Sequence, residues 1–173
     1  MMKKVILALF LILTVAITGG AQSLTSKDWG AETEVQNGAT VTIMTSFEND
    51  GSCIMLMFLN MEIERGTLMM AMIAPGTYTF NGKRLSMKIN TRKAQFYDDI
   101  DMKASNKSLA DKMNHVMKQE LDKYMPHMKQ DFLGIVADYS TLEVTKLTGN
   151  KMETTIGTFA GYDKGTLQKM CTE

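Results

Sequence analysis

The chain has 173 residues, and its 19 basic and 19 acidic side chains give a formal net charge of zero. This length suits one domain around a single core, and a hydrophobic content of 45% with two prolines argues against intrinsic disorder. Because the charge is balanced and there is no long basic run, we expect no nucleic-acid partner.

The first residues have the pattern of a secretory signal peptide. Two lysines precede an apolar run, Val5–Ile17, and small residues at 19–21 provide a cleavage site. The run is shorter than the roughly 20 residues of a membrane-spanning helix. We therefore predict a signal peptide over 1–21 and one domain over 22–173. The mature chain is expected in the periplasm or outside the cell, with no membrane-spanning segment.

Short strands are predicted along the first half of the mature chain, after a polar segment that contains the only tryptophan. Apolar and polar residues alternate with a period of two, which is typical of strands. Hairpin signals at Asn49-Asp50-Gly51 and Asn81-Gly82 separate some of them. The predicted strands cover 41–47, 53–64, 68–74, the residues around Tyr78 and Phe80, 85–89 and 94–102.

The period then changes to steps of three and four residues, which predicts a helix over about 105–133. Pro126 predicts a kink or the start of a second helix. Strand patterns return over 142–147 and 152–156, and a short last strand is predicted near 166–170. The apolar stripe of the helix is Leu109, Met113, Met117, Leu121, Tyr124, Met128 and Phe132.

Sequential strands joined by tight hairpins form an antiparallel sheet, and closure into a barrel is the simplest way to protect its edges. The predicted fold is therefore mainly β: an antiparallel up-and-down barrel with the helical insertion before the last strands. We expect the helix to cover an open end of the barrel or to pack on its outer wall.

Two segments, 47–52 and 76–87, resemble the bacterial exported lipocalin-like (calycin-type) domain family. The shared pattern is a strand ending in an aromatic residue, an Asp-Gly hairpin, and then Gly-x-Tyr-x-x-x-Gly-x-x-Leu. The hairpin over 142–156 fits the closing strands of that family. Trp29 lacks the glycine usually found two residues earlier, and the helix is long. The resemblance implies a lipocalin-like barrel that holds an apolar ligand, and it implies no catalytic residues.

Methionine is unusually frequent, with 17 residues. Its flexible side chain fills irregular cores and also adapts to varied apolar ligands. Small barrels are either filled by their own side chains or hold a ligand, and the sequence leaves both alternatives open. The candidate pocket residues are Met55, Met57, Leu59, Met70, Met72, Tyr78, Leu85 and Met87.

No motif points to catalysis or to a cofactor. The sequence contains no Gly-x-Ser-x-Gly elbow, no phosphate-binding loop and no zinc-site spacing of its two histidines. The acidic residues Asp98, Asp99 and Asp101 do not match a calcium-binding loop. We therefore expect a non-enzymatic protein without a cofactor or a resident metal. Export permits a disulfide between Cys53 and Cys171, which the sequence leaves open.

Three functional hypotheses follow. The first is a carrier for a small apolar ligand inside the barrel. The second is an envelope protein that offers a surface, such as the helix, to a partner protein. The third is Cu(I) binding, because thioethers are soft ligands and His115 and His127 lie close to methionines in the sequence.

Overall fold

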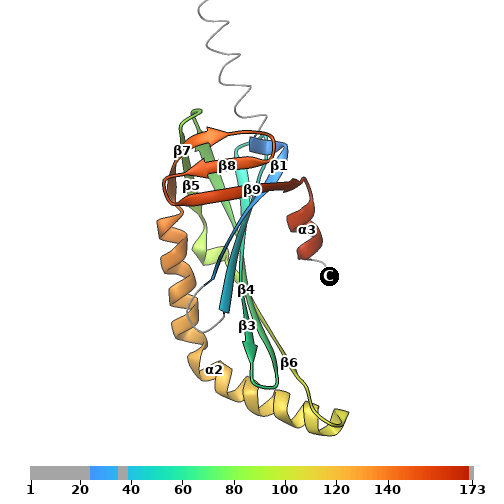
Figure 1. Cartoon of the computed structure of the whole chain (residues 1–173). Coiled ribbons are helices and arrows are strands. Elements are labelled where there is room, and N and C mark those ends of the chain that lie inside the picture. Colours follow the sequence, from blue (N-terminus) through green and yellow to red (C-terminus); the bar gives the residue numbers. More distant parts are fainter. Residues whose placement is uncertain (1–23, 35–38, 172–173) are drawn as a thin grey trace, which may run out of the picture.

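The computed structural model describes residues 24–34 and 39–171, so the predicted signal peptide lies outside the described residues (Figure 1). The described chain forms one antiparallel sheet of nine strands, with a long helix inserted before the last strands. The elements are β1 (Lys27–Glu34), β2 (Ala39–Phe47), β3 (Ser52–Ile63), β4 (Gly66–Phe80), β5 (Arg84–Ile89), η2 (Thr91–Lys93), β6 (Gln95–Met102), α2 (Lys107–Asp138), β7 (Thr141–Leu147), β8 (Lys151–Thr154), β9 (Gly157–Asp163) and α3 (Thr166–Met170).

Eight of these strands form a near-closed ring. They follow one another in the order β3-β2-β1-β9-β8-β7-β5-β4, and the pairing of β3 with β4 joins the two ends. β6 lies outside this ring and pairs only with β4. The predicted mainly-β, antiparallel architecture is therefore confirmed, with the ring complete at one end of the molecule only.

The ring is incomplete because β4 changes its neighbour along its length. Residues Gly66–Ile73 pair with β6, whereas Gly76–Phe80 pair with β5. Pro75 lies between the two paired stretches, opposite neither β5 nor β6. Because no residue of those strands pairs with it, the missing N–H of Pro75 costs no hydrogen bond of the sheet. The next residue must be small, because a Cβ at Gly76 would lie 2.8 Å from the carbonyl oxygen of Lys88.

α2 covers the open side of the ring. It runs from the end of β6 to the start of β7 (Figure 1), and it buries Leu121, Phe132 and Val136 against the inner face of the sheet. The helix continues through Pro126 and bends near its middle. A proline removes one backbone donor and crowds the carbonyl four residues earlier, which accounts for the predicted kink.

The hydrophobic core lies between the inner face of the ring and α2. Trp29 is completely buried, and its Nε1 donates a hydrogen bond of 2.8 Å to the carbonyl oxygen of Leu24. Methionines supply much of the remaining volume, which confirms their predicted role in packing. The buried methionines of this core are Met55, Met57, Met70, Met72, Met87 and Met152.

Three parts of the sequence prediction differ from the structure. β1 and β9 were not predicted as strands, because small and polar residues such as Gly30 and Gly161 weaken their patterns. The predicted last strand at 166–170 is instead the helix α3. On α2, Met125 packs against the core whereas Tyr124 is 61% exposed. Among the described residues, no helix is long and apolar enough to cross a membrane.

Two glycine substitutions test this packing in opposite directions. Gly76→Ala should lower the free energy of unfolding by about 1–3 kcal/mol, because its Cβ meets the backbone of β5. Gly134→Ala should raise it by about 1 kcal/mol, because that glycine lies in α2 with open space around it. Urea denaturation of both variants measures the two changes in the free energy of unfolding. Equal changes in the two variants would contradict the close approach of β5 to Gly76.

Candidate functional site

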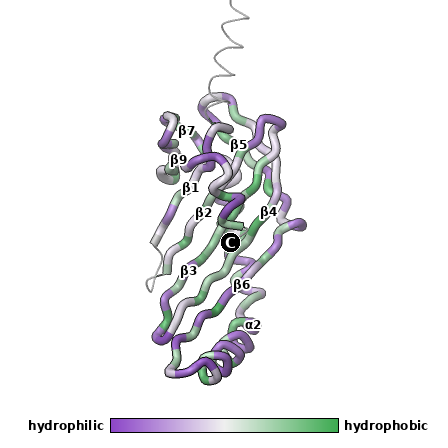
Figure 2. The backbone as a smooth tube through the Cα atoms, turned by 90° about the vertical axis from the view of Figure 1, so that its right-hand side faces the viewer, coloured by the Kyte–Doolittle hydropathy of each residue, from purple (hydrophilic) through white to green (hydrophobic). Residues whose placement is uncertain are grey.

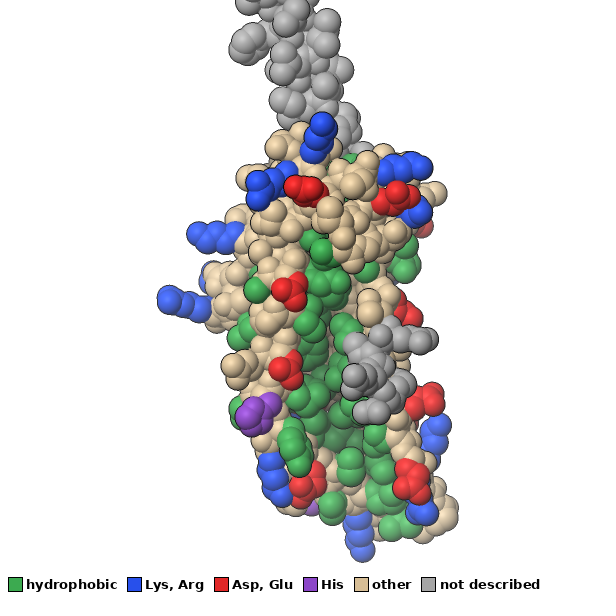
Figure 3. All heavy atoms as spheres, turned by 60° about the vertical axis from the view of Figure 1, so that its left-hand side comes forward, with side chains coloured by type: hydrophobic (Ala, Val, Ile, Leu, Met, Phe, Trp, Pro, Cys, Tyr) green, Lys and Arg blue, Asp and Glu red, His purple; other side chains and the backbone are tan. Residues whose placement is uncertain are grey.

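An apolar groove separates α2 from β2 and β3. It encloses about 270 Å³, and Figure 3 shows a band of apolar side chains running down this side of the molecule. One charged side chain, Asp131, lies among the residues that line it. We call this the helix–sheet groove, and its apolar lining residues are Val41, Leu59, Met128, Phe132 and Ile135.

Polar contacts fasten α2 on the side opposite the groove. Lys118 forms an ion pair with Asp98 of β6, and the hydrogen bond to this carboxylate raises the pKa of the lysine. Asn114 accepts a 2.8 Å hydrogen bond from the backbone N–H of Met102. This bond satisfies one donor at the edge of β6, where no further strand pairs.

Aromatic contacts add to this attachment. Lys129 Nζ lies 5.1 Å from the ring centroid of Phe96, and that ring lies 6.4 Å from the ring of Phe132. Between α2 and β2 or β3, by contrast, the described residues form no hydrogen bond, so that side of the helix rests on apolar contact alone. Among the described residues, the polar contacts between α2 and the sheet are therefore made with β6, and its contacts with β2 and β3 are apolar.

The eight predicted pocket residues lie together on the inner face of β3, β4 and β5. Cross-strand register places them on that one face, with Met57 opposite Met72 and Tyr78 opposite Met87. The interior around them is filled by their own side chains, since Met55, Met57, Met70, Met72 and Leu85 are each at most 1% exposed. Of the eight, Leu59 lines the helix–sheet groove.

Sequence reasoning did not select most of the groove. Val41 appeared only as a strand residue, and Met128 and Phe132 only as members of the apolar stripe of the helix. Their convergence depends on how α2 crosses the sheet, which periodicity does not specify. The signal in the sequence that could have indicated the groove was the edge of the apolar stripe of the helix. Apolar residues at the margin of a buried face often border a cleft.

The two cysteines do not form the disulfide that the sequence left open. Both are free: Cys53 is buried on the inner face of β3, whereas Cys171 is exposed after α3. α3 packs on the outer face, where its Leu167 is buried with Met44 and Leu56. The two thiols therefore lie on opposite faces of the sheet. Burial raises the pKa of the Cys53 thiol to about 11.

The acidic residues and histidines considered for metal binding do not converge. Asp98 points inward to Lys118, whereas Asp99 and Asp101 alternate onto the exposed outer face. His115 and His127 are exposed on α2, and the His115 ring lies 3.1 Å from the Gln119 amide. In the described part of the chain, no group of three or more His, Cys, Asp or Glu side chains could hold a metal ion.

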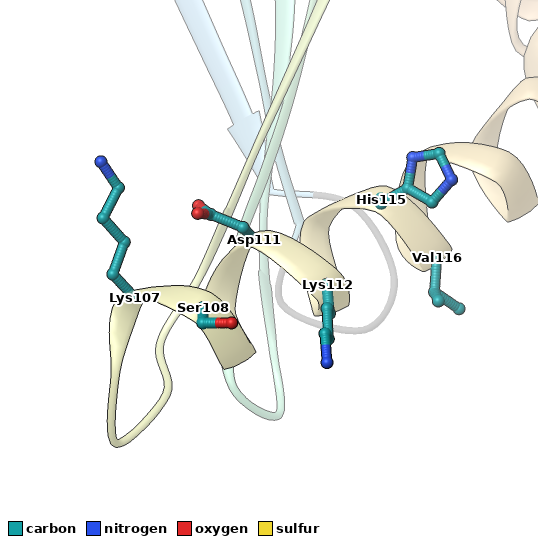
Figure 4. Close-up of a pocket in the computed structure, with 6 residues that line it drawn as sticks. All are labelled: Lys107, Ser108, Asp111, Lys112, His115 and Val116. Atoms are coloured by element: carbon teal, nitrogen blue, oxygen red, sulfur yellow. The ribbon is translucent and has the colours of Figure 1, made fainter.

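A second hollow lies at the start of α2 and is lined by Lys107, Ser108, Asp111, Lys112, His115 and Val116. Figure 4 shows that these side chains leave a single helix in different directions. They do not converge on a common point, so the hollow offers no defined set of contacts to a ligand. The helix–sheet groove is the better candidate because side chains from three elements, α2, β2 and β3, line it.

The chain matches no protein-family model and no curated protein sequence. The chemistry and geometry of the groove are therefore the basis for a functional proposal.

The separation of the cysteines predicts selective alkylation. Iodoacetamide should modify Cys171 and not Cys53 in the native protein, because Cys53 is 1% exposed and burial raises the pKa of its thiol, whereas the exposed thiolate is the reactive form. Mass spectrometry of the labelled protein measures this, with the urea-unfolded protein as the control for two labels. If the native protein takes up no iodoacetamide until a reducing agent is added, the two cysteines form a disulfide, which would contradict their assignment as free thiols.

Proposed function

We propose that the protein is an exported, non-enzymatic, lipocalin-like binding protein that holds a small apolar ligand in the helix–sheet groove. The observation that carries this proposal is the groove itself, in which aliphatic, thioether and aromatic side chains from α2, β2 and β3 enclose about 270 Å³. Apolar contact without a converging set of polar groups supports binding rather than catalysis.

The size of the groove favours a slender ligand. Its volume is slightly below the roughly 300–1,000 Å³ typical of pockets for drug-sized molecules. Asp131 at the groove disfavours an anionic group inside it. A linear alkyl chain fits both features, with its polar end left in solvent. Each buried methylene group contributes about 0.8 kcal/mol, so several would hold such a chain.

The flexibility of the lining provides the means of entry. Met128 is half-buried at the groove, and its unbranched side chain can change rotamer with little strain. Because no hydrogen bond joins this side of α2 to β2 or β3 in the described residues, a ligand can part the two without breaking a polar contact. The attachment of α2 to β6 would meanwhile keep the helix in place.

Filling the groove should abolish binding. We expect Met128→Trp and Met128→Lys to weaken binding of the neutral fluorescent probe N-phenyl-1-naphthylamine at least tenfold, because one occupies the groove and the other places a charge in it. Leu133→Trp is the matched control, since this residue lies 37% exposed on the same helix. Fluorescence titration, with displacement by dodecanol, measures the affinities.

Three results would contradict the proposal. One is an absence of probe binding to the wild-type protein. Another is binding that survives both Met128 variants. The third is an equal loss of binding in Leu133→Trp. Thermal melts of each variant separate a lost site from a lost fold.

Export has its own test. If residues 1–21 are a signal peptide, the protein recovered from the periplasm or medium of a bacterial host should begin at Gln22. Its intact mass should equal that of the chain over residues 22–173. Replacement of Leu9 and Leu11 by lysine should interrupt the apolar run and leave the full-length chain in the cytoplasm. Full-length protein outside the cytoplasm would contradict the predicted cleavage.

A further inference from the structure

A row of three neighbouring hollows crosses the outer face of the sheet, opposite the face that carries the core. Adjacent hollows share lining residues. Ile54 and Ile73 line both the hollow under α3 and the next one, and Pro75 and Lys93 line both that one and the hollow at the end of β5. We call this feature the outer furrow, and Figure 2 views the sheet from this side.

Strand register sets the direction of the outer furrow. Asp28 pairs with Ser46, Ser46 with Ile54, and Ile54 with Pro75, so these residues form one row across four strands. With neighbouring strands about 4.8 Å apart, the furrow from β1 to β5 is roughly 19 Å long. An extended chain rises about 3.3 Å per residue, so roughly six residues would span it.

One end of the outer furrow is basic. Lys88, Arg92 and Lys93 line it together with backbone around Gly76. All three cationic side chains are exposed, and none forms an ion pair with another described residue. Such a cluster attracts carboxylate or phosphate groups, and arginine binds them with a fixed two-pronged geometry.

The other end holds a buried acceptor. Asp28 is completely buried, and its Oδ2 accepts hydrogen bonds of 3.0 Å and 2.9 Å from the backbone N–H groups of Gly165 and Leu167. Its Oδ1 has no hydrogen-bond partner among the described residues. A buried carboxylate is costly unless it is paired, and the charge of Lys164 supplies the pairing here.

Lys164 is the charged partner of this carboxylate. Its Nζ forms an ion pair with Asp28 Oδ1 at 3.6 Å, a distance too long for a hydrogen bond. The same Nζ donates to Ser46 Oγ at 2.7 Å and to the carbonyl oxygen of Phe47 at 2.8 Å, and it pairs with Glu48 at 2.8 Å. Two carboxylates therefore share one lysine, which leaves this end of the outer furrow acidic.

The middle of the outer furrow is apolar. Ile54 is 40% exposed and Ile73 is half-buried beside it. An occupant must therefore bring anionic groups to one end, an aliphatic group to the middle and a cationic group to the other end, where two carboxylates share Lys164. An anionic lipid matches the basic end and the middle, but its alkyl tail brings no cation to the acidic end. An extended peptide provides all three kinds of group.

We propose that the outer furrow is the docking surface for a short extended segment of a partner protein, about six residues long. The segment carries acidic side chains over Lys88, Arg92 and Lys93 and an aliphatic side chain over Ile54 and Ile73. A basic side chain of the segment lies at the acidic end, beside the exposed carboxylate of Glu48. This surface is separate from the helix–sheet groove and does not depend on a ligand there.

Peptide selection tests the proposal directly. Random heptapeptides displayed on phage are selected on the immobilised mature protein, and the enriched sequences are made as fluorescein-labelled peptides for anisotropy titration. We expect enriched peptides to combine an aliphatic residue with acidic residues on one side. The triple variant Lys88→Ala, Arg92→Ala, Lys93→Ala should bind them at least tenfold more weakly.

The matched control removes equal charge elsewhere: Lys103→Ala, Lys107→Ala, Lys112→Ala should retain binding. Ile54→Ser should weaken binding at least fivefold by removing the apolar middle, and Met128→Trp should leave it unchanged, which separates this test from that of the groove. No enrichment, or equal loss in both triple variants, would overturn the proposal. So would binding to phosphatidylcholine vesicles with 25% phosphatidylglycerol in the absence of peptide binding, because it would assign the furrow to a membrane.

Discussion

The change of partner along β4 is the constraint on which the rest of the structure depends. One strand of fifteen residues serves two neighbours on the same edge, β6 along Gly66–Ile73 and β5 along Gly76–Phe80. Pro75 and Gly76 suit the change, since one needs no donor there and the other permits the close approach of β5. The ring therefore closes at one end and opens at the other.

The opening explains why a long helix is inserted before the last strands. An open sheet with an apolar inner face needs a cover, and α2 supplies it with Leu121, Phe132 and Val136. Attachment is uneven: an ion pair, a side-chain hydrogen bond and a cation–aromatic contact hold the helix to β6, while in the part of the chain that the structure describes its contacts with β2 and β3 are apolar. The proposed ligand groove follows from this asymmetry.

The sheet also has two distinct faces. Its inner face packs the core, and its outer face carries the outer furrow, which is basic at one end and acidic at the other.

Local patterns predicted much of the fold, because alternation in 41–47 and 53–64 and the helical stripe around Leu121 report burial directly. They could not predict features that arise between distant segments. The 166–170 segment is a helix against the outer face, where Asp28, far earlier in the chain, accepts hydrogen bonds from the backbone N–H groups of Gly165 and Leu167. Val41 and Ile135 line one groove because α2 crosses the sheet at a particular place. The eight pocket candidates were correctly grouped on one inner face, yet their own side chains fill it.

The most direct test of the central claim uses a neutral spin-labelled alkyl chain, the methyl ester of a doxyl-labelled stearic acid, and methyl NMR spectra of the mature protein. Unpaired electrons broaden the signals of nearby methyl groups. If the alkyl chain enters between α2 and the sheet, the methyl signals of Val41, Leu59, Met128 and Ile135 should broaden, while those of Ile54 and Ile73 on the outer face stay sharp. Broadening confined to Ile54 and Ile73, or no broadening at any of these positions, would contradict the account.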